Sequence, residues 1–376
     1  MTRIDWASRF GAIMLVAAGI AAAAAALPGD PYQRFATLDN TIQNRIRWVY
    51  ERTHFDPTPI DVVVIGSSRT GAAIAAPQLE TGLRAAGRAV HVVNFSLPEA
   101  GRDLNWVLLQ QVLATKHPRL FVIGVTEKPS RFGHPAFKYV ASTADIVDPA
   151  YVGNLNYLTN LAYLPFRGLR LFAARVLPGH LGLPVAFAPA RYAGTSDDTT
   201  KSFRAGDGTL VERNRTVSPA ALAAGVVRYE RGVRPPLLGR RWADVEFGDD
   251  RAYLARMAAL AHSRGVRIVF LFLPYYTGPS AIQERSFYER FGPVLDATFV
   301  SRRSDWYSDA AHLNHTGALV VTEWLTERLA PLLAPAESAA APMRSDGGPG
   351  QQLPRAIALP ASAPPPAPTI VPSPLS

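Results

Sequence analysis

Four mainly apolar runs constrain the fold of this chain more than any other feature of its sequence. Such runs are typical of strands that are buried on both faces of a parallel sheet. Each of the last three follows a segment with helical spacing of apolar residues, so strand and helix alternate. The sequence therefore predicts an α/β fold with a doubly wound parallel sheet. The predicted strands are residues 61–66, 89–95, 119–125 and 266–273, and the predicted helices before the last three are residues 79–86, 104–115 and 252–264.

The length and composition fit one main domain with insertions. The chain has 376 residues, of which 48% are hydrophobic, enough to bury one sizeable core. It has no cysteine, which excludes disulfides, thiolate metal sites and a cysteine nucleophile. The formal net charge is +9, but the arginines are scattered and no basic run is interleaved with aromatic residues, so we expect no nucleic-acid partner. The histidines show no metal-ligand spacing with carboxylates, and neither a metal nor a cofactor is predicted.

An uncharged segment near the N-terminus predicts a membrane anchor. Residues 10–27 follow Arg3 and Arg9 and are about as long as a helix that crosses the hydrocarbon core. The two arginines favour a cytoplasmic N-terminus, which would place the rest of the chain in the periplasm. We therefore expect a single-pass protein of the inner membrane. The alanines before Leu27 also resemble a cleavage site, so a cleaved signal peptide and a secreted chain are the alternative.

Two further segments fall outside the alternation of strand and helix. Residues 130–250 contain many aromatic residues and arginines and an Asp207-Gly208 turn signal, but no clear further strand for the sheet, which predicts an insertion or lid. Past Ala334 the sequence turns to alanine, proline, serine and glycine, with too little bulky apolar content to order it. The predicted organisation is an anchor or signal peptide (1–30), an α/β domain (31–334) and a disordered tail (335–376).

A first candidate site follows the first predicted strand, which ends in Gly66-Ser67-Ser68-Arg69. Ligands of open α/β sheets bind beyond the carboxyl ends of the strands. A serine hydroxyl at this position lies at the start of the next helix, where backbone N–H groups could bind an oxyanion. The alternative is that the serine only caps the helix.

A second candidate site lies just before an apolar helix predicted at residues 318–329. Asp309 and His312 are three residues apart and could share a hydrogen bond. Such a bond fixes the imidazole tautomer, so that the other ring nitrogen can take a proton from a serine. The alternative is a helix N-terminus with Asp309 as a surface carboxylate and no role for His312.

Together these motifs resemble the SGNH (GDSL-type) hydrolase superfamily, which implies a flavodoxin-like fold. The resemblance covers roughly residues 60–333, without the middle insertion. The N-terminal span, the Gly-Ser-Ser form in place of Gly-Asp-Ser, and the aromatic-Ser-Asp lead-in to the histidine resemble the envelope branch of the superfamily. That branch includes the alginate acetylation proteins and the protein that helps D-alanylate teichoic acids. The matching motifs are Gly66-Ser67-Ser68, Asn94-Phe95-Ser96-Leu97-Pro98 with Gly101, and Asp309-x-x-His312-x-Asn314-x-x-Gly317.

The resemblance implies a role for each member of a catalytic triad. Ser68 would be the nucleophile, His312 the general base and then acid, and Asp309 the carboxylate that orients the histidine. Ser67 takes the place of the family's aspartate and is the alternative nucleophile.

The resemblance also implies an oxyanion hole, and here the sequence departs from the family. The N–H groups of Ser68 and Gly101 would donate to the oxyanion. The family's Gly-x-Asn-Asp block would add an asparagine, but this chain reads Gly124-Val125-Thr126-Glu127. We expect the hydroxyl of Thr126 to substitute for that asparagine, and Glu127 to point away.

Four residues are candidates for substrate contacts. Arg69 either binds a polyanionic acceptor or pairs with a carboxylate such as Glu127 or Glu99. Asn94 lies next to the end of the second predicted strand, and Tyr275 and Tyr276 follow the fourth, at the same edge of the sheet.

The implied activity is acyl transfer, with an acetyl group passed through Ser68 to a hydroxyl of an envelope or exported polysaccharide. A multi-spanning membrane acyltransferase would be the partner that donates the acyl group. The same triad gives an esterase or deacetylase if water reaches the acyl-enzyme. A non-catalytic scaffold for a membrane acyltransferase is the remaining alternative, and the missing asparagine favours it.

Overall fold

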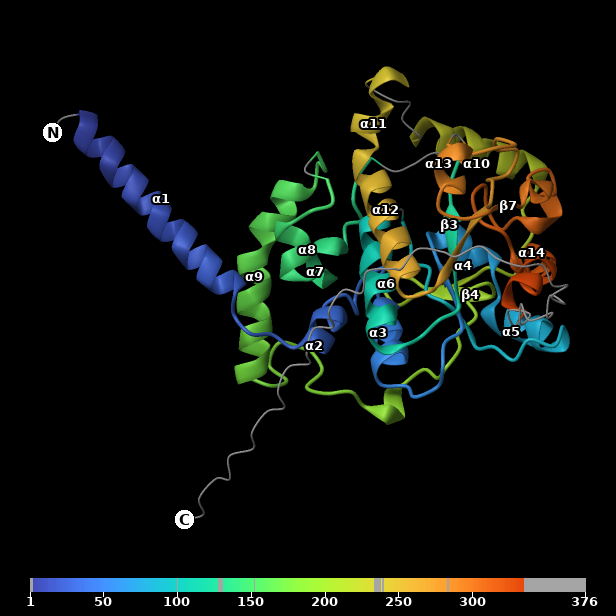
Figure 1. Ribbon diagram of the computed structural model, residues 1–376, viewed down its shortest axis with the longest axis horizontal. Coiled ribbons are helices and arrows are strands. Elements are labelled where there is room, and N and C mark those ends of the chain that lie inside the picture. Colours follow the sequence, from blue (N-terminus) through green and yellow to red (C-terminus); the bar gives the residue numbers. More distant parts are fainter. Residues whose placement is uncertain are drawn as a thin grey trace, which may run out of the picture. The chain divides into compact units, whose positions relative to one another are not determined.

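The computed structural model describes residues 3–334, except residues 100, 128–130, 152, 233–237, 239 and 283. The described chain is an α/β fold around a five-stranded parallel sheet with the order β2-β1-β3-β6-β7 (Figure 1). All four predicted strands are confirmed. The fifth, β7, is only three half-buried residues long at the sheet edge, too short to give an apolar run. The strands are β1 (Val62–Ile65), β2 (Val92–Asn94), β3 (Leu120–Val125), β6 (Arg267–Phe272) and β7 (Val294–Asp296).

The helices predicted from apolar spacing are also present, as α5, α6, α12 and α14. The predicted tail, residues 335–376, lies outside the described residues. The helices are α1 (Arg3–Ala25), α2 (Pro31–Ala36), α3 (Ile46–His54), α4 (Ser68–Ala73), α5 (Ala76–Ala85), α6 (Arg102–Thr115), α7 (Phe137–Val140), α8 (Thr143–Val147), α9 (Tyr157–Val176), α10 (Pro219–Gly232), α11 (Ala243–Glu246), α12 (Gly248–Ser263), α13 (Arg285–Glu289) and α14 (His315–Leu329).

Helices cover both faces of the sheet. Side chains alternate along a strand, so Val63 of β1 packs in one core with residues of α6 and α12, while Val64 packs in a second core with residues of α5 and α14 (Figure 1). Every residue of β1 and β3 is buried. Burial on both faces explains why these strands have continuous apolar sequences.

The strand order places a crevice at the carboxyl ends of β1 and β3. The chain runs from β1 outward to β2 and then returns to the other side of β1 as β3. Ligands of open α/β sheets bind where the order reverses in this way. Ile65, the last residue of β1, pairs with Ile123 of β3, so Gly66 lies beside Gly124 near the carboxyl end of β3.

The segment between β3 and α12 adds no strand to the main sheet within its described residues, as predicted, because β3 pairs directly with β6. It forms the helices α7 to α11 and a separate antiparallel hairpin, β4 (Ser202–Arg204) and β5 (Leu210–Glu212). The predicted turn closes this hairpin, since Asp207 Oδ1 accepts a hydrogen bond of 2.9 Å from the N–H of Thr209.

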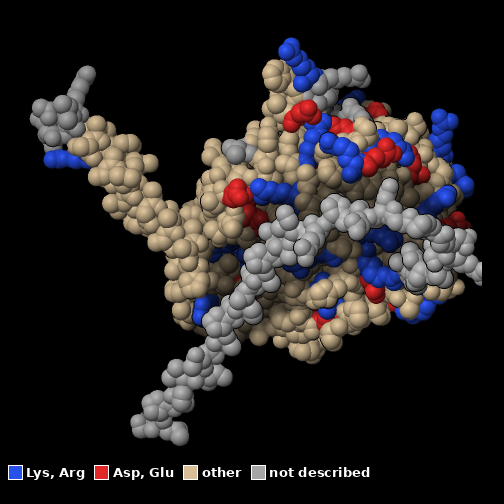
Figure 2. All heavy atoms as spheres, in the orientation of Figure 1, with Lys and Arg blue, Asp and Glu red and all other residues tan. Residues whose placement is uncertain are grey.

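Helix α1 is long and apolar enough to span a membrane. Its segment Trp6–Ala25 has a mean hydropathy of 1.7 and is almost entirely exposed. In Figure 2 its surface carries no charged side chain beyond its N-terminal end. The C-terminal end of α1 packs on α9, where Gly168 lies against the main chain of Ala24. A signal sequence passes the same test of length and composition, so the anchor and the cleaved signal peptide both fit this helix.

Three carboxyl groups are buried where α6 packs against α12. Asp103 accepts hydrogen bonds from the N–H groups of Leu104 and His134, and Asp250 lies 3.7 Å from Arg102. Asp249 Oδ1 is buried without a hydrogen-bond partner in the described part of the chain. Burial and the neighbouring charge of Asp250 raise the pKa of Asp249 to about 7. Asp249 is therefore a source of pH-dependent stability.

We expect Asp249→Asn to stabilise the fold at pH 8 but not at pH 4. The pKa of Asp249 is higher in the folded chain than its unfolded value of about 3.9, so the unfavourable contribution of the carboxylate grows between about pH 4 and pH 7. Three pKa units correspond to about 4 kcal/mol, and burial of the replacing amide offsets part of this. The gain at pH 8 should be about 2 kcal/mol in the free energy of unfolding.

The measurement is urea unfolding of the full chain in detergent at both pH values. Asp305→Asn is the matched control, because Asp305 pairs with Arg303 on the surface and should give no comparable gain. An equal gain at pH 4 and pH 8 for Asp249→Asn would contradict the prediction.

Candidate active site

Ser68, His312 and Asp309 form a continuous row of hydrogen bonds. Ser68 Oγ lies 2.9 Å from His312 Nε2, although 244 positions separate the two residues. His312 Nδ1 lies 2.9 Å and 3.0 Å from the two carboxylate oxygens of Asp309. Contact of a hydroxyl with a base that a carboxylate orients is the arrangement that activates a serine nucleophile. The structure thus brings together the three predicted catalytic side chains.

The turn after β1 directs Ser68 toward His312. Gly66 has no room for a side chain, because a Cβ there would lie 2.5 Å from Thr70 Oγ1 and 3.3 Å from the Cα of Gly124. Ser67 caps α4, since its Oγ accepts a hydrogen bond of 3.3 Å from the N–H of Arg69. The capping role predicted as the alternative for this motif therefore falls to Ser67, and the contact with His312 falls to Ser68.

A tight loop before α14 positions the other two residues. Asp309 Oδ1 accepts hydrogen bonds of 2.8 Å from the N–H of Ala311 and 3.0 Å from the N–H of His312. Asn314 caps α14 by accepting a hydrogen bond of 2.9 Å from the N–H of Gly317. The Asp-x-x-His-x-Asn-x-x-Gly motif is therefore a structural unit that ends in a helix cap.

The environment of Asp309 keeps it ionised. Burial raises the pKa of Asp309. The opposing effect of the hydrogen bonds from the His312 ring and from the N–H groups of Ala311 and His312 is larger, and the pKa falls to about 2. An ionised carboxylate accepts a hydrogen bond from an Nδ1 that carries a proton. Nε2 is then unprotonated and can accept a hydrogen bond from the Ser68 hydroxyl. The triad is thus set for proton transfer from Ser68 to His312.

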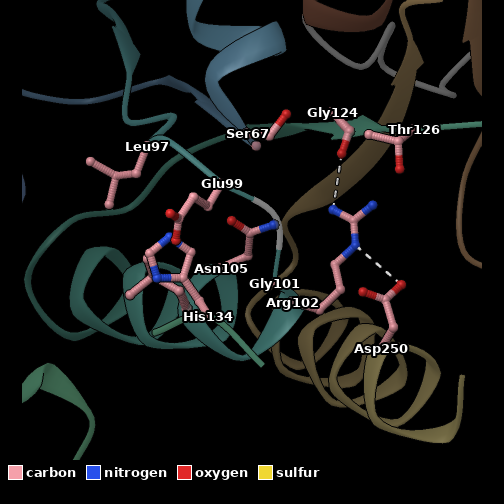
Figure 3. Close-up of a pocket in the computed structure, with 12 residues that line it drawn as sticks. Ser67, Leu97, Glu99, Gly101, Arg102, Asn105, Gly124, Thr126, His134 and Asp250 are labelled. Carbon is pink, nitrogen blue, oxygen red and sulfur yellow. Dashed lines mark hydrogen bonds and ion pairs between the residues drawn. The ribbon is translucent and has the colours of Figure 1, made fainter. Parts of the chain in front are cut away.

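Two of the three predicted oxyanion donors, Gly101 and Thr126, line a small cavity at the carboxyl ends of β1 and β3, and the third, Ser68, does not. Gly101 and Thr126 line it together with Gly66 and Ser67, and its volume of about 20 Å³ has room for one water molecule (Figure 3). Gly101 has a φ of 153°, and a Cβ there would lie 2.6 Å from the N of His134. The N–H groups of Ser68 and Gly101 donate no hydrogen bond to any described residue.

Asn105 is a residue of this cavity that the sequence did not reveal. It projects from α6 beside Gly101 and Arg102 (Figure 3). It is 7% exposed, and its amide forms no hydrogen bond within the described ranges. The cavity therefore contains a carboxamide, although the position where the resemblance places one holds Thr126.

Arg69 is held by the protein itself. It donates hydrogen bonds of 2.6 Å to Glu127 Oε2, 2.6 Å to the hydroxyl of Tyr229 and 3.1 Å to the carbonyl of Leu273. Burial raises the pKa of Glu127, but the charge of Arg69 and the hydrogen bonds that the carboxylate accepts together lower it below its usual value. Of the two alternatives for Arg69, the structure shows the pairing with Glu127. Glu127 was expected to point away from the oxyanion hole, and it does not line the small cavity that Gly101 and Thr126 line.

The other predicted substrate contacts are also engaged in internal contacts. The amide of Asn94 donates to the carbonyl of Ile74 at 2.9 Å and accepts from the N–H of Ser96 at 3.1 Å. The hydroxyl of Tyr275 donates to Glu230 at 2.8 Å, and the ring of Tyr276 packs edge-on against Tyr307. None of these side chains lines the two hollows that Ser68 lines. Their predicted role in binding remains a prediction.

Ser68 lies where two hollows meet. Their volumes are about 590 Å³ and 350 Å³, and the smaller one also reaches His312 and Asp309. The walls come from the segment before and within α3 and from the β4–β5 hairpin of the insertion. The sequence did not indicate these walls. The residues that both hollows share with Ser68 are Ile42, Pro98, Phe203 and Arg213.

No family model matches the chain, and no curated protein matches it. Within the described residues, no group of three or more His, Asp or Glu side chains is placed to hold a metal ion. The geometry of the triad and of the hollows beside it is therefore the basis for a functional proposal.

Proposed function

We propose that this chain is a membrane-anchored serine acyltransferase of the SGNH type. It faces the periplasm and O-acetylates an envelope or exported polysaccharide through an acyl-enzyme on Ser68. The observation that carries the proposal is the contact of 2.9 Å between Ser68 Oγ and His312 Nε2, with Asp309 behind the imidazole.

The triad supports a two-step transfer. His312 takes the proton of the Ser68 hydroxyl as Oγ attacks the acyl carbon of the donor, and it returns that proton to the departing oxygen. A sugar hydroxyl then gives its proton to His312 and attacks the acyl carbon. The bond between the acyl carbon and Ser68 breaks, and His312 returns that proton to Ser68 Oγ. The N–H groups of Ser68 and Gly101 would stabilise the negative oxygen of each tetrahedral intermediate.

The fold is consistent with the SGNH type. Counted within the main sheet alone, the strand order is 2-1-3-4-5, which is the flavodoxin-like order. Arg3 and Arg9 lie in the N-terminal third of α1 and favour a periplasmic location for the rest of the chain. A multi-spanning membrane acyltransferase would then supply the acyl group from the same membrane.

Two alternatives remain in view. An esterase or deacetylase would use the same triad with water as acceptor, and the hollow of about 590 Å³ beside Ser68 favours transfer because it has room for a sugar acceptor. A non-catalytic scaffold was favoured by the missing asparagine. The amide of Asn105 in the cavity lined by Gly101 weakens that argument.

The test offers the full chain, in detergent, a chromogenic acetyl ester with and without an oligosaccharide acceptor. We expect a mass increase of one acetyl group on the protein, located at Ser68 by peptide sequencing, and an acetylated sugar when the acceptor is present. Acetate release at the same rate with and without acceptor, and no acetylated sugar, would favour the esterase. If the protein forms no acetyl adduct and the ester is not turned over, the result favours the non-catalytic scaffold.

A further inference from the structure

Arg213 is a buried cation beside the triad that forms no ion pair with any described residue. It directly follows β5, and its N–H donates 2.7 Å to the carbonyl of Lys201, which extends the hairpin. The side chain is 7% exposed, and its guanidinium lies 4.3 Å from the ring centroid of Phe203. Its Nε is fully buried without a hydrogen bond, and the guanidinium forms no ion pair with any described residue.

Such an arrangement is unfavourable for the protein alone. Burial lowers the pKa of Arg213 to about 10, and the charge of Asp309 opposes only part of this. A buried charge is normally paired and hydrogen-bonded, because its desolvation is otherwise uncompensated. Of the other arginines that line the larger hollow, Arg45 pairs with Asp197 and Arg47 pairs with Asp39. Arg191 and Arg204 form no ion pair with a described residue, but both are exposed to water. Arg213 thus differs from its neighbours in being buried without an anion.

The unpaired charge of Arg213 lies at the same hollows as the proposed nucleophile. Arg213 lines both hollows that meet at Ser68. The smaller hollow is lined by three acidic residues, Glu99, Glu212 and Asp309, and by one arginine besides Arg213, so its acidic side chains outnumber its arginines and oppose the entry of an anion. In the larger hollow the acids are neutralised, because Asp39, Asp197 and Glu51 each have an arginine within 4.0 Å. An anionic group would therefore reach Arg213 through the larger hollow.

We propose that Arg213 binds an oxyanion group, a carboxylate or a phosphate, of the acceptor that Ser68 acylates. A planar guanidinium binds both groups through two parallel hydrogen bonds. The site selects acceptors that carry such a group near the reacting hydroxyl. This assignment rests on the proposed acyl transfer for its kinetic consequences, but the binding of the anion does not depend on catalysis.

The kinetic test compares the full chain and Arg213→Gln with three acceptors, namely a neutral oligosaccharide, its counterpart with a uronic acid, and its counterpart with a sugar phosphate. We expect the variant to raise the KM for the preferred anionic acceptor by roughly 10- to 100-fold, the usual effect of losing hydrogen bonds to a charged group. The KM for the neutral acceptor should change little. The anionic acceptor whose KM rises more in the variant shows whether the bound group is a carboxylate or a phosphate. Lys201→Gln, an exposed cation on the same hairpin, is the matched control.

A direct binding measurement separates this proposal from the proposed function. Calorimetry with the uronic-acid oligosaccharide and the sugar phosphate should show binding to the wild-type chain that Arg213→Gln weakens, even if no acetyl transfer occurs. Arg213→Gln should also unfold at the same or a higher temperature than wild type, because it removes an unpaired buried charge. A fall in kcat that is equal for neutral and anionic acceptors would show that Arg213 acts through Asp309, and would overturn the proposal. The proposal would also be overturned if neither the uronic-acid oligosaccharide nor the sugar phosphate bound to the wild-type chain.

Discussion

Ser68→Ala is expected to lower the turnover of an acetyl ester by a factor on the order of 10⁴ or more, whereas Ser67→Ala retains most of it. The two serines are adjacent, but only the hydroxyl of Ser68 contacts His312, at 2.9 Å. Ser67 Oγ instead accepts from the N–H of Arg69 as the cap of α4. Its loss should cost about 1 kcal/mol of stability and leave the proton path intact.

The adjacent serines form a matched pair of variants. Both remove one hydroxyl from the same turn, so the difference in turnover isolates the nucleophile from general damage to the loop. Turnover is measured with a chromogenic acetyl ester, and the acetyl adduct is located by mass spectrometry. Full activity of Ser68→Ala together with loss of activity in Ser67→Ala would reverse the assignment and give the nucleophilic role to Ser67.

The sequence predicted the part of the fold that lies on buried strands. β1, β3 and β6 have continuous apolar sequences because both of their faces are covered, and that pattern needs no knowledge of tertiary contacts. Ser68 and His312 were also predictable, since each lies at the junction of a loop and a helix that Ser67 or Asn314 caps.

The walls of the hollows were not predictable, for physical reasons that differ from case to case. The strands of the β4–β5 hairpin are three residues each and largely exposed, so they carry no apolar pattern. Asn105 lies within a helix, where nothing in the sequence indicates which side faces a cavity. For Asn94 and Tyr275, the edge of the sheet was predictable from the sequence, but the direction of the side chain was not. Direction depends on partners such as Ile74 and Glu230 that come from other segments.

The buried pair of Arg69 and Glu127 leads to the second large expected effect. Arg69→Met should lower the free energy of unfolding by about 3–5 kcal/mol, because it leaves the carboxylate of Glu127 buried and unpaired. The two side chains are 2.6 Å apart and both less than one-tenth exposed. The double variant Arg69→Met/Glu127→Gln should be less destabilised than the sum of the single variants, because neither charge then remains alone.

Urea unfolding of the four proteins, wild type, both single variants and the double variant, gives the coupling energy of the pair. Arg303→Met is the control, since Arg303 pairs with Asp305 on the surface and such pairs contribute at most about 1 kcal/mol. The cycle also separates the two predicted roles of Arg69. If Arg69 holds the start of α4 in place through Glu127 and Tyr229, its removal lowers the free energy of unfolding, and the double variant recovers part of that loss. A residue that binds the acceptor would instead raise KM with stability unchanged, and that result would return Arg69 to the substrate site.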